Sequence, residues 1–576
     1  MRRFAIACSL SLVAASARAQ TFPTQDPFIR HIYAIGMDSS ALQSEAHTLF
    51  DSLGPRLQGT PNLKRAQDWL VDRYTSWGID AKEEQYGTWR GWVRGHSHID
   101  LVSPRNRTLQ GQMVGYSPGT GGKDVVLEPV VLPQFKDSTE FVAWLPQAKG
   151  KLVMISAPLP TCRPQDDWAA NATPESKARM DTLMVTTQRE WAPRRALPGA
   201  PGGESAGVRG TGYFTALGGG ELGVRLEAGG AGGIIVSRPK LPWSLGGGRT
   251  PAQVVEAAAS GTSAGRYFGS GALNTGWGAM EVFETYNTKT PAIALDCEDY
   301  GLVARLAAAG DQPKLKLNLD GKLLGEQPVF NVVARIPGTE HPDEYVVLSA
   351  HFDSWDGSSG ATDNGTGTLT MLEAMRILKQ VYPKPKRTIL VGHWSGEEEG
   401  EVGSKAFTED HPEVLSGLEA LFNQDNGTGR IAFIGGAGLV GAPAHVNDWL
   451  SKIPTEFRAQ LNGGQPVVPG RPAGGGSDDF PFGCRGLPAF GLGSLGWDYG
   501  NVTWHTERDT YDKVVFDDLR YNATLTAMLA YLASEDPARI PLDRVDVTAM
   551  SGGRGPARGG WPECEKAPRK TEPRLK

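Results

Sequence analysis

Two histidines and several acidic residues occur at separate places along the chain, and these are residue types that bind catalytic zinc. Imidazole nitrogens and carboxylate oxygens are the ligands that zinc takes in open catalytic sites. None of these places contains cysteine, which excludes a closed structural site of four cysteines. The candidate residues are His351 with Asp353, then Asp363, the triplet Glu397, Glu398 and Glu399, Asp425, and His505 with Asp509.

The donors are sufficient for two Zn²⁺ ions that share one carboxylate. Two metal ions about 3.5–4 Å apart would share a hydroxide and stabilise a tetrahedral intermediate. Each ion would keep three protein ligands and one open position, which lowers the pKa of bound water to about 7. We expect one ion to be held by His351, Asp363 and Asp425, and the other by Asp363, Glu398 and His505, with Asp363 as the bridge.

Glu397 is next to an expected ligand but is not needed to complete either ligand set. We therefore expect it to be the general base, which takes a proton from the attacking water and passes it to the leaving amine. Asp353 and Asp509 lie close in sequence to the two expected histidine ligands. We expect Asp353 to orient the imidazole of His351, and Asp509 to orient that of His505.

Other catalytic chemistries fit the sequence less well. Ser404 and Ser477 both follow glycine but lie outside any Gly-x-Ser-x-Gly turn, which disfavours a serine hydrolase. Residues 364–368 lack the Gly-Lys-Ser/Thr ending of a phosphate-binding loop. The remaining histidines are predicted to be structural or on the surface, because one lies within a strand and the others lack carboxylate neighbours. They are His31, His47, His96, His98, His341, His393, His411 and His445.

The candidate residues follow short apolar segments that are typical of buried strands. Residues 345–350 lead into His351, residues 388–394 lead toward the Glu triplet, and residues 420–423 lead toward Asp425. Helical patterns alternate with these strands, one near residues 366–381 and another near Lys405. Such alternation predicts an α/β fold, a mixed sheet with helices on both faces, and ligands bind such sheets beyond the carboxyl ends of the strands.

Three other stretches lack this alternation of strand and helix patterns. From about residue 124 to 320, short apolar runs are broken by Gly and Pro, which predicts a separate β-rich module. Within it, residues 163–222 show no steady period and are predicted to be a long surface insertion. The stretch after residue 536 is rich in Pro, Gly, Arg and Lys without an apolar period, and we expect it to be disordered.

Composition excludes several classes of protein. The 58 basic and 64 acidic side chains give a formal charge of −6, which does not fit a basic nucleic-acid binder. Residues 1–19 combine arginines, a short apolar run and a small-x-small ending, which predicts a signal peptide for export to the periplasm or the medium. No later stretch has the apolar length of a membrane span. Four cysteines remain after this segment, and their irregular spacing leaves any disulfide pairing open.

Taken together, these motifs resemble those of the exported co-catalytic dizinc aminopeptidases and their relatives, plasma glutamate carboxypeptidase (carboxypeptidase Q) and the folate-hydrolysing glutamate carboxypeptidase. The resemblance implies a zinc exopeptidase fold and the same roles for the expected ligands and base. It is carried by residues 351–355, 360–365, 397–404 and 505–510, together with Asp425.

The same resemblance also implies a domain organisation. Residues 228–236 and 290–295 are similar to an inserted β-rich protease-associated domain, and residues 53–60 to an N-terminal segment of the peptidase domain. The implied domains are a signal peptide over 1–19, an N-terminal part of the peptidase domain over 20–122, the protease-associated domain over 123–322, the catalytic part over 323–536, and the tail over 537–576.

The sequence departs from the family pattern in the expected substrate loop. Many relatives read Ser-Asp-His where this chain has Ser477, Asp478 and Asp479. The extra carboxylate would favour a free substrate amine or would only bond within the loop, and the sequence leaves both readings open.

The predicted function is a dizinc metallo-exopeptidase of the aminopeptidase or dipeptidase type that hydrolyses short peptides. The alternatives are an amidohydrolase resembling glutamate carboxypeptidase or aminoacylase, and a catalytically silent binding ectodomain, which the intact ligand set disfavours. Preference for the amino or the carboxyl terminus of the substrate stays open, as does homodimer formation.

Overall fold

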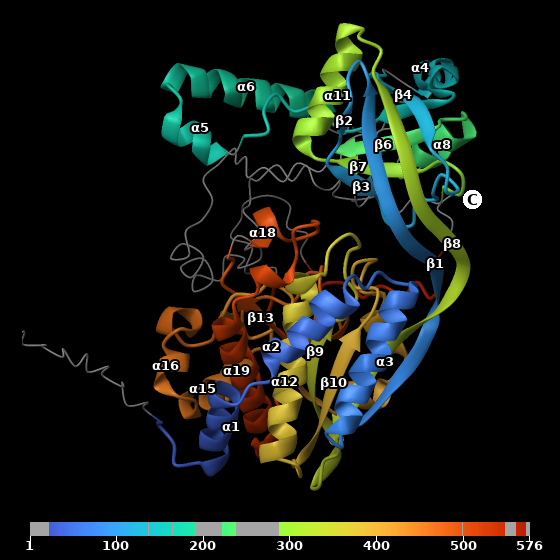
Figure 1. The fold of residues 1–576 in the computed structure, drawn as a ribbon. Helices are drawn as coiled ribbons and strands as arrows, with labels where there is room; N and C mark the ends of the chain where they lie inside the picture. The colour runs from blue at the N-terminus through green and yellow to red at the C-terminus, as the bar shows by residue number, and fades with distance from the viewer. Residues whose placement is uncertain are drawn as a thin grey trace, which may run out of the picture.

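One continuous mixed sheet runs through both parts of the molecule, and two long antiparallel strands connect the parts (Figure 1). These strands are β1 (Asp80–Ser103) and β8 (Lys314–Ile336). The computed structural model describes residues 22–135, 138–163, 165–191, 222–237, 287–497, 499–547 and 560–571. The predicted signal peptide lies outside the described residues. Among the helices that are described, none has the length and apolar character needed to cross a membrane.

We call the two parts lower and upper after their places in Figure 1. The lower part of the sheet contains the strands that were expected to precede the candidate residues. The strand order is β12 (Ile431–Ile434), β13 (Ala489–Ser494), β11 (Leu418–Asn423), β9 (His341–His351), β10 (Arg387–Trp394) and β8. Strands β13, β11, β9 and β10 are parallel, whereas β12 and β8 pair antiparallel with their neighbours. The carboxyl ends of the parallel strands therefore meet along one edge of the sheet.

Alternating side chains of these strands bury both faces of the sheet. On β9, Val346 and Leu348 belong to the largest hydrophobic core, while Val347 belongs to another core on the opposite face. Burying such a side chain contributes about 1.5–3 kcal/mol. Because neighbouring residues point to opposite faces, a shift of one residue would misplace every one of these side chains. The pairing register of the central strands is therefore strongly determined by the sequence.

Helices cover each of these two faces. The largest core includes residues of α1 (Pro27–Asp38), α3 (Pro61–Ser76), α12 (Thr366–Val381), α15 (Ala442–Lys452) and α19 (Phe516–Glu535). The core on the other face includes residues of α13 (Val402–Asp410), α14 (Pro412–Ser416) and α17 (Phe480–Gly483). This arrangement confirms the predicted α/β class with helices on both faces. The helices expected near residues 366–381 and Lys405 are α12 and α13.

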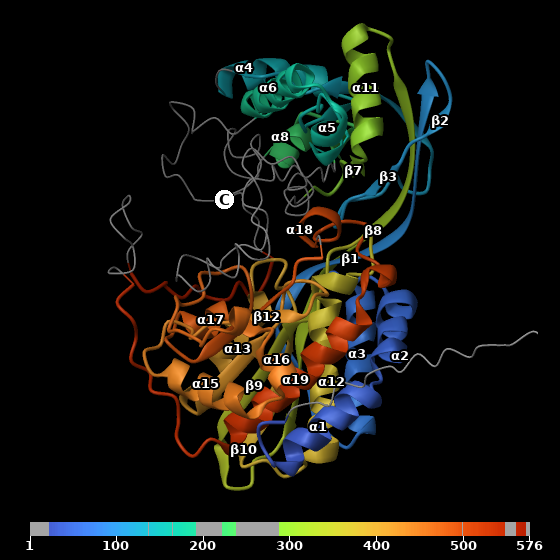
Figure 2. The ribbon, with the colours of Figure 1, turned by 90° about the vertical axis from the view of Figure 1, so that its left-hand side faces the viewer.

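The upper part continues the sheet through five short strands. They are β4 (Val125–Val131), β5 (Lys151–Met154), β6 (Gly233–Ser237), β7 (Ala292–Leu295) and β3 (Gly111–Met113). Helices α4 (Ser138–Trp144), α8 (Leu222–Ala228) and α11 (Cys297–Ala309) lie beside this part of the sheet in Figures 1 and 2. The core of this part includes Trp92 and Leu101 of β1, so it begins before the predicted boundary at residue 123. Strand β1 thus extends from the lower part into the core of the upper part, and the predicted domain boundaries remain a prediction.

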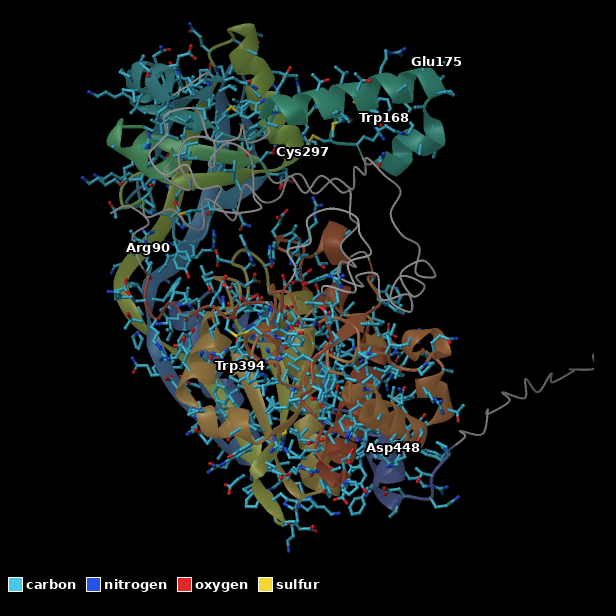
Figure 3. The ribbon with its side chains drawn as sticks, turned by 180° about the vertical axis from the view of Figure 1, so that it is seen from behind. Arg90, Trp168, Glu175, Cys297, Trp394 and Asp448 are labelled. Carbon is cyan, nitrogen blue, oxygen red and sulfur yellow. A yellow bond between two sulfur atoms is a disulfide. The ribbon has the colours of Figure 1, made fainter. Side chains whose placement is uncertain are left out.

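The start of the predicted 163–222 insertion is helical. Helices α5 (Gln165–Asn171) and α6 (Pro174–Trp191) occupy it, and residues 192–221 lie outside the described residues. A disulfide joins Cys162, just before α5, to Cys297 at the start of α11, where Figure 3 marks Cys297. The assignment of the upper part as a protease-associated domain remains a prediction.

The prediction of a disordered tail over 537–576 is wrong for residues 537–547 and 560–571. A disulfide joins Cys564 to Cys484, and the indole of Trp561 donates a hydrogen bond to the carbonyl of Gly483 (3.0 Å). Further on, Arg569 pairs with Glu409 and Asp410 of α13. Contacts with distant residues of the same chain, rather than an amphipathic face, hold the segment in place. Such contacts leave no apolar period in the sequence.

Candidate metal centre

The candidate residues converge where the parallel strands of the lower part end. His351 is the last residue of β9 and is paired with Trp394, the last residue of β10. Asp425 lies two residues beyond the end of β11, which pairs with β9 on its other side. Asp363 precedes α12, and His505 lies in the loop that leads to α19. The structure therefore brings together side chains that are separated by up to 154 residues in the chain.

One group of potential metal ligands consists of His351, Asp363 and Asp425. Nε2 of His351 lies 3.1 Å from Oδ1 of Asp425 and 3.5 Å from Oδ1 of Asp363. The His351 side chain is 1% exposed, so water does not solvate this imidazole. These atoms could surround one divalent cation.

The second group consists of Asp363, Glu398 and His505. Nε2 of His505 lies 3.0 Å from Oε2 of Glu398 and 3.3 Å from Oδ2 of Asp363. Asp363 thus presents Oδ1 to the first group and Oδ2 to the second. This geometry is the one that a bridging carboxylate requires.

The electrostatics of the groups suit cations. Burial and the nearby Asp363 raise the pKa of Glu398 well above its ordinary value. Burial alone would lower the pKa of His351, but the carboxylate of Asp425 and hydrogen bonds that the imidazole donates to neighbouring carboxylates raise it well above normal. Within the described chain, Oδ2 of Asp363 and Oε1 of Glu398 are buried without a hydrogen-bond partner. Two divalent cations would stabilise the charged carboxylates and occupy these oxygens.

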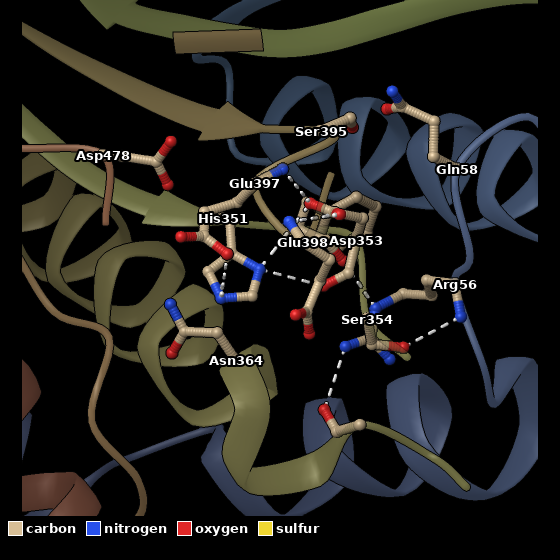
Figure 4. Close-up of polar contacts among 12 residues, drawn as sticks. Arg56, Gln58, His351, Asp353, Ser354, Asn364, Ser395, Glu397, Glu398 and Asp478 are labelled. Carbon is tan, nitrogen blue, oxygen red and sulfur yellow. Dashed lines mark hydrogen bonds and ion pairs between the residues drawn. The ribbon is translucent and has the colours of Figure 1, made fainter. Parts of the chain in front are cut away.

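Glu397 faces the same cluster without belonging to either ligand group (Figure 4). Its Oε2 lies 3.9 Å from Nε2 of His351. Burial raises the pKa of the Glu397 carboxyl well above its ordinary value, and the charge of Asp425 acts in the same direction. A carboxyl group with a raised pKa close to a reaction centre is suited to accept and return a proton.

Asp353 supports the centre through two different contacts. Its carboxylate accepts hydrogen bonds from the backbone amides of Glu397 (3.2 Å) and Glu398 (3.3 Å). Nδ1 of His351 lies 3.1 Å from the backbone carbonyl of Asp353 and 3.6 Å from its carboxylate. The imidazole is therefore oriented mainly by the backbone of Asp353, while the carboxylate positions the glutamate loop.

The carboxylate of Asp509 holds the loop that carries Asp363. It accepts hydrogen bonds from the backbone amides of Thr362 (2.7 Å) and Asp363 (2.9 Å). Burial, followed by the charge of Asp363, raises the pKa of Asp509 to about 7. We expected Asp509 to orient His505, but its hydrogen bonds are made to this loop.

Asp478 and Asp479 lie at the amino end of α17, near the centre. The carboxylate of Asp478 is buried and accepts a hydrogen bond from the hydroxyl of Ser404. Burial raises the pKa of Asp478 well above its ordinary value and that of Asp479 to about 7. Figure 4 shows Asp478 on the same side of the sheet edge as His351 and Glu397.

Sequence reasoning missed two residues that hold the centre in place. The indole of Trp355 donates a hydrogen bond to Oε2 of Glu398 (2.6 Å), and its ring stacks on the imidazole of His505 at 4.6 Å. Buried Arg56 donates to the carbonyls of Phe352 (2.7 Å) and Gly360 (2.9 Å), and burial lowers its pKa to about 10. Both residues occur in the segments that carry the family resemblance, which was the available signal.

The indole nitrogen of Trp355 provides a test of the Glu398 position. Trp355→Phe keeps an aromatic ring beside His505 but removes the hydrogen bond to Glu398. Loss of an outer partner of a ligand lowers metal affinity or activity by about 10–100-fold, and we expect an effect of that size on zinc affinity. Trp561→Phe, which removes an indole hydrogen bond to a backbone carbonyl rather than to a ligand, should leave zinc affinity unchanged. Equal zinc affinity of the two variants in a chelator competition would contradict the assigned contact.

The other histidines differ in part from prediction. His393 lies within β10, its ring contacts the hydroxyl of Tyr74 (2.7 Å), and burial lowers its pKa to about 3, as expected of a structural histidine. Four histidines that were expected to lack carboxylate neighbours have one within 3.1 Å. The pairs are His47 with Asp51, His98 with Asp100, His411 with Glu84 and Glu413, and His445 with Asp536.

Comparison with known proteins identifies relatives of the lower part. Residues 331–530 match the sequence pattern of peptidase family M28. Carboxypeptidase Q of Xenopus laevis is 25% identical over 378 residues, which cover 66% of this chain and 63% of that protein. Leucine aminopeptidase 1 of Coccidioides posadasii (strain C735) is 31% identical over 216 residues, which cover 35% of this chain and 55% of that protein. The match thus spans less than two thirds of the length of either relative.

A solved structure supports the fold. The crystal structure of a Peptidase M28 precursor from Shewanella amazonensis SB2B superposes with a TM-score of 0.58 and 22% sequence identity. The alignment covers 89% of this chain and 97% of that one. This similarity includes the mixed sheet and its helices.

Proposed function

We propose, from the peptidase family M28 domain that residues 331–530 form, that this protein is a zinc-dependent exopeptidase acting on short peptides. One observation carries the proposal. The two sets of potential ligands, each with one histidine, share Asp363, which presents a different carboxylate oxygen to each set. The donor set contains nitrogen and oxygen ligands and no sulfur, which suits catalytic zinc. We further propose that each group holds one ion, so the centre holds two Zn²⁺.

The chain's own side chains supply the remaining chemistry. Zinc bound at this centre would supply Lewis acidity toward the scissile carbonyl and would acidify water. Oε2 of Glu397 accepts the proton of the attacking water and returns it to the nitrogen of the leaving amine. Asp353 fixes the backbone of Glu397, and Trp355 fixes the Glu398 carboxylate, so both glutamates keep their orientation during turnover.

The surroundings of the centre favour a substrate with a free amino terminus. Asp478, which is buried, and Asp479 and Glu399, which are partly exposed, add carboxyl groups beyond the expected ligands. Two buried cations in this region are already engaged, because Arg56 bonds to backbone carbonyls and Lys405 pairs with Glu401 (2.8 Å). An ammonium group would stabilise the charged form of these acids, which burial disfavours, whereas a substrate carboxylate would disfavour that form further.

A preference for the carboxyl terminus is the second candidate, and Arg508 is the observation that favours it. This residue lies three positions beyond His505, and its side chain is 55% exposed. Its guanidinium could bind the terminal carboxylate of a short peptide. A dipeptidase would bind the substrate amine through the acids near the centre and the substrate carboxylate through Arg508.

Export is proposed from the signal-like residues 1–19 and receives support from the cysteines. The pairs Cys162–Cys297 and Cys484–Cys564 form disulfides, which persist in oxidising compartments. The proposed location is the periplasm or the medium.

Metal analysis with a matched panel of substrates tests the proposed function. The panel contains aminoacyl anilides, free dipeptides, N-acetylated dipeptides and carboxyl-amidated dipeptides. We expect bound zinc and hydrolysis of free and amidated dipeptides, with N-acetylated ones resistant. Preferential hydrolysis of N-acetylated substrates would indicate an aminoacylase, and resistance of amidated ones would indicate recognition of the carboxyl terminus. Zinc binding without any hydrolysis would contradict the proposed enzyme.

A further inference from the structure

A third group of potential metal ligands lies far from the candidate metal centre. Glu419, His445 and Asp536 each offer a ligand atom within 4.8 Å of the others. Glu419 is near the beginning of β11, whereas Asp425 follows the end of the same strand. Six residues of extended chain span about 20 Å, so this group is separate from the catalytic edge of the sheet. We propose that Glu419, His445 and Asp536 form a structural site for a transition-metal dication such as Zn²⁺.

The first argument is geometric. Nδ1 of His445 lies 2.9 Å from Oδ2 of Asp536. The corresponding nitrogen-to-oxygen distances at the candidate centre are 3.1 Å for His351 and Asp425 and 3.0 Å for His505 and Glu398. At such spacings, one metal ion could contact both the imidazole nitrogen and the carboxylate oxygen. The third group therefore repeats the local arrangement of the other two.

The second argument is the unsatisfied oxygen of Glu419. This residue is 0% exposed, and within the described chain its Oε1 has no hydrogen-bond partner. Its Oε2 accepts only a long bond from the backbone amide of Ile540 (3.3 Å). A buried carboxylate oxygen without a partner is costly unless a ligand occupies it. At the candidate centre, Asp363 and Glu398 have unsatisfied oxygens of the same kind.

Other histidine and carboxylate pairs among the described residues lack this combination. His411 contacts both Glu84 and Glu413 at 2.9 Å, but Glu413 is 60% exposed in its side chain and water solvates it. At the proposed structural site, the side chains of His445 and Asp536 are 15% and 8% exposed. The arrangement is thus buried yet reachable from solvent, as a metal site requires.

The charges around the site decide which metal would bind. Two arginines, Arg387 and Arg539, lie close enough to Glu419 to act on its charge. Arg387 is engaged with Glu344 (2.6 Å), and Arg539 donates to backbone carbonyls. The positive charges of Arg387 and Arg539 oppose the binding of a weakly held ion such as Mg²⁺. An imidazole ligand favours zinc and similar metals instead.

An ion at this site would join three elements of the lower part. Glu419 lies on β11, His445 on α15, and Asp536 directly after α19. The indole of Trp449, also on α15, already donates to Asp536 (2.8 Å). The ion would therefore stabilise the contact of both helices with the amino end of the strand that leads to Asp425.

Metal stoichiometry tests the proposal. Wild type, Glu419→Gln, His445→Gln and His411→Gln are freed of metal with a chelator, saturated with Zn²⁺, desalted and analysed for zinc per chain. Glu419→Gln and His445→Gln should each bind one zinc ion fewer than wild type, with peptidase turnover retained. The control His411→Gln should bind as much as wild type. Equal zinc content in all four proteins would overturn the proposal.

The design separates this site from the proposed catalytic function. The measured quantity is a difference between proteins, so it does not depend on how many ions the candidate metal centre holds. Gln has nearly the same size and shape as Glu, so the Glu419→Gln variant is expected to fold and decides the outcome if His445→Gln does not fold. Thermal unfolding gives a second readout: Zn²⁺ should raise the Tm of metal-free wild type by more than that of Glu419→Gln. An equal rise in Tm would contradict the site.

Discussion

Glu397→Gln is expected to lower kcat for peptide hydrolysis by about 10²–10⁴-fold, the usual contribution of a general base. The amide of Gln cannot accept the proton of the attacking water. It keeps the shape of the side chain, and Glu397 belongs to neither ligand group, so zinc content should not change. Steady-state kinetics combined with zinc analysis of the same preparation measures both quantities.

Glu399→Gln is the matched control for this variant. Glu399 belongs to the same acidic triplet, is partly exposed, and accepts a hydrogen bond from the hydroxyl of Tyr116 (3.0 Å). Because it lies in neither ligand group, its neutralisation should affect kcat far less than that of Glu397. If Glu397→Gln bound zinc normally and hydrolysed peptides at the wild-type rate, the base would have to be another residue.

Asp363→Asn is expected to have the other large effect, because one carboxylate serves both proposed ions. Asn offers one oxygen and no charge, so it cannot bridge the groups around His351 and His505. Polarisation by the metal is worth several kcal/mol, and its loss corresponds to a fall in kcat/KM of about 10³–10⁵-fold. Zinc content should fall together with activity, in contrast to Glu397→Gln.

The control for this prediction is Asp512→Asn. Asp512 is an exposed aspartate whose side chain is 70% accessible, and it pairs with its neighbour Lys513. Its replacement should change neither zinc content nor activity. Full zinc content and full activity in Asp363→Asn would show that this residue bridges nothing.

Local sequence patterns were sufficient for the catalytic half of the fold. Apolar runs of four to seven residues predicted the central strands β9, β10 and β11, and the helical period predicted α12 with its observed bounds. Parallel strands end at a common edge, so the polar residues that follow each strand were expected to meet. The structure places His351, Asp363, Glu398, Asp425 and His505 together there.

Contacts between distant segments could not be predicted in this way. Asp509 bonds to residues 362–363, and Trp355 reaches from the loop after β9 to both Glu398 and His505. Strand β1 extends from the lower part into the core of the upper part. None of these relations has a period or spacing in the sequence.

The sequence by itself determined which residues are buried in strands and helices and which polar side chains follow them, because backbone periodicity and apolar burial act locally. Only the tertiary structure decided which carboxylate supports which ligand, how the cysteines pair, and that residues 560–571 are held against α13. It also joined Glu419, His445 and Asp536, which lie 117 positions apart at the extremes. These choices depend on the packing of whole elements, and the physical reason is that their partners meet only after the sheet and its helices have assembled.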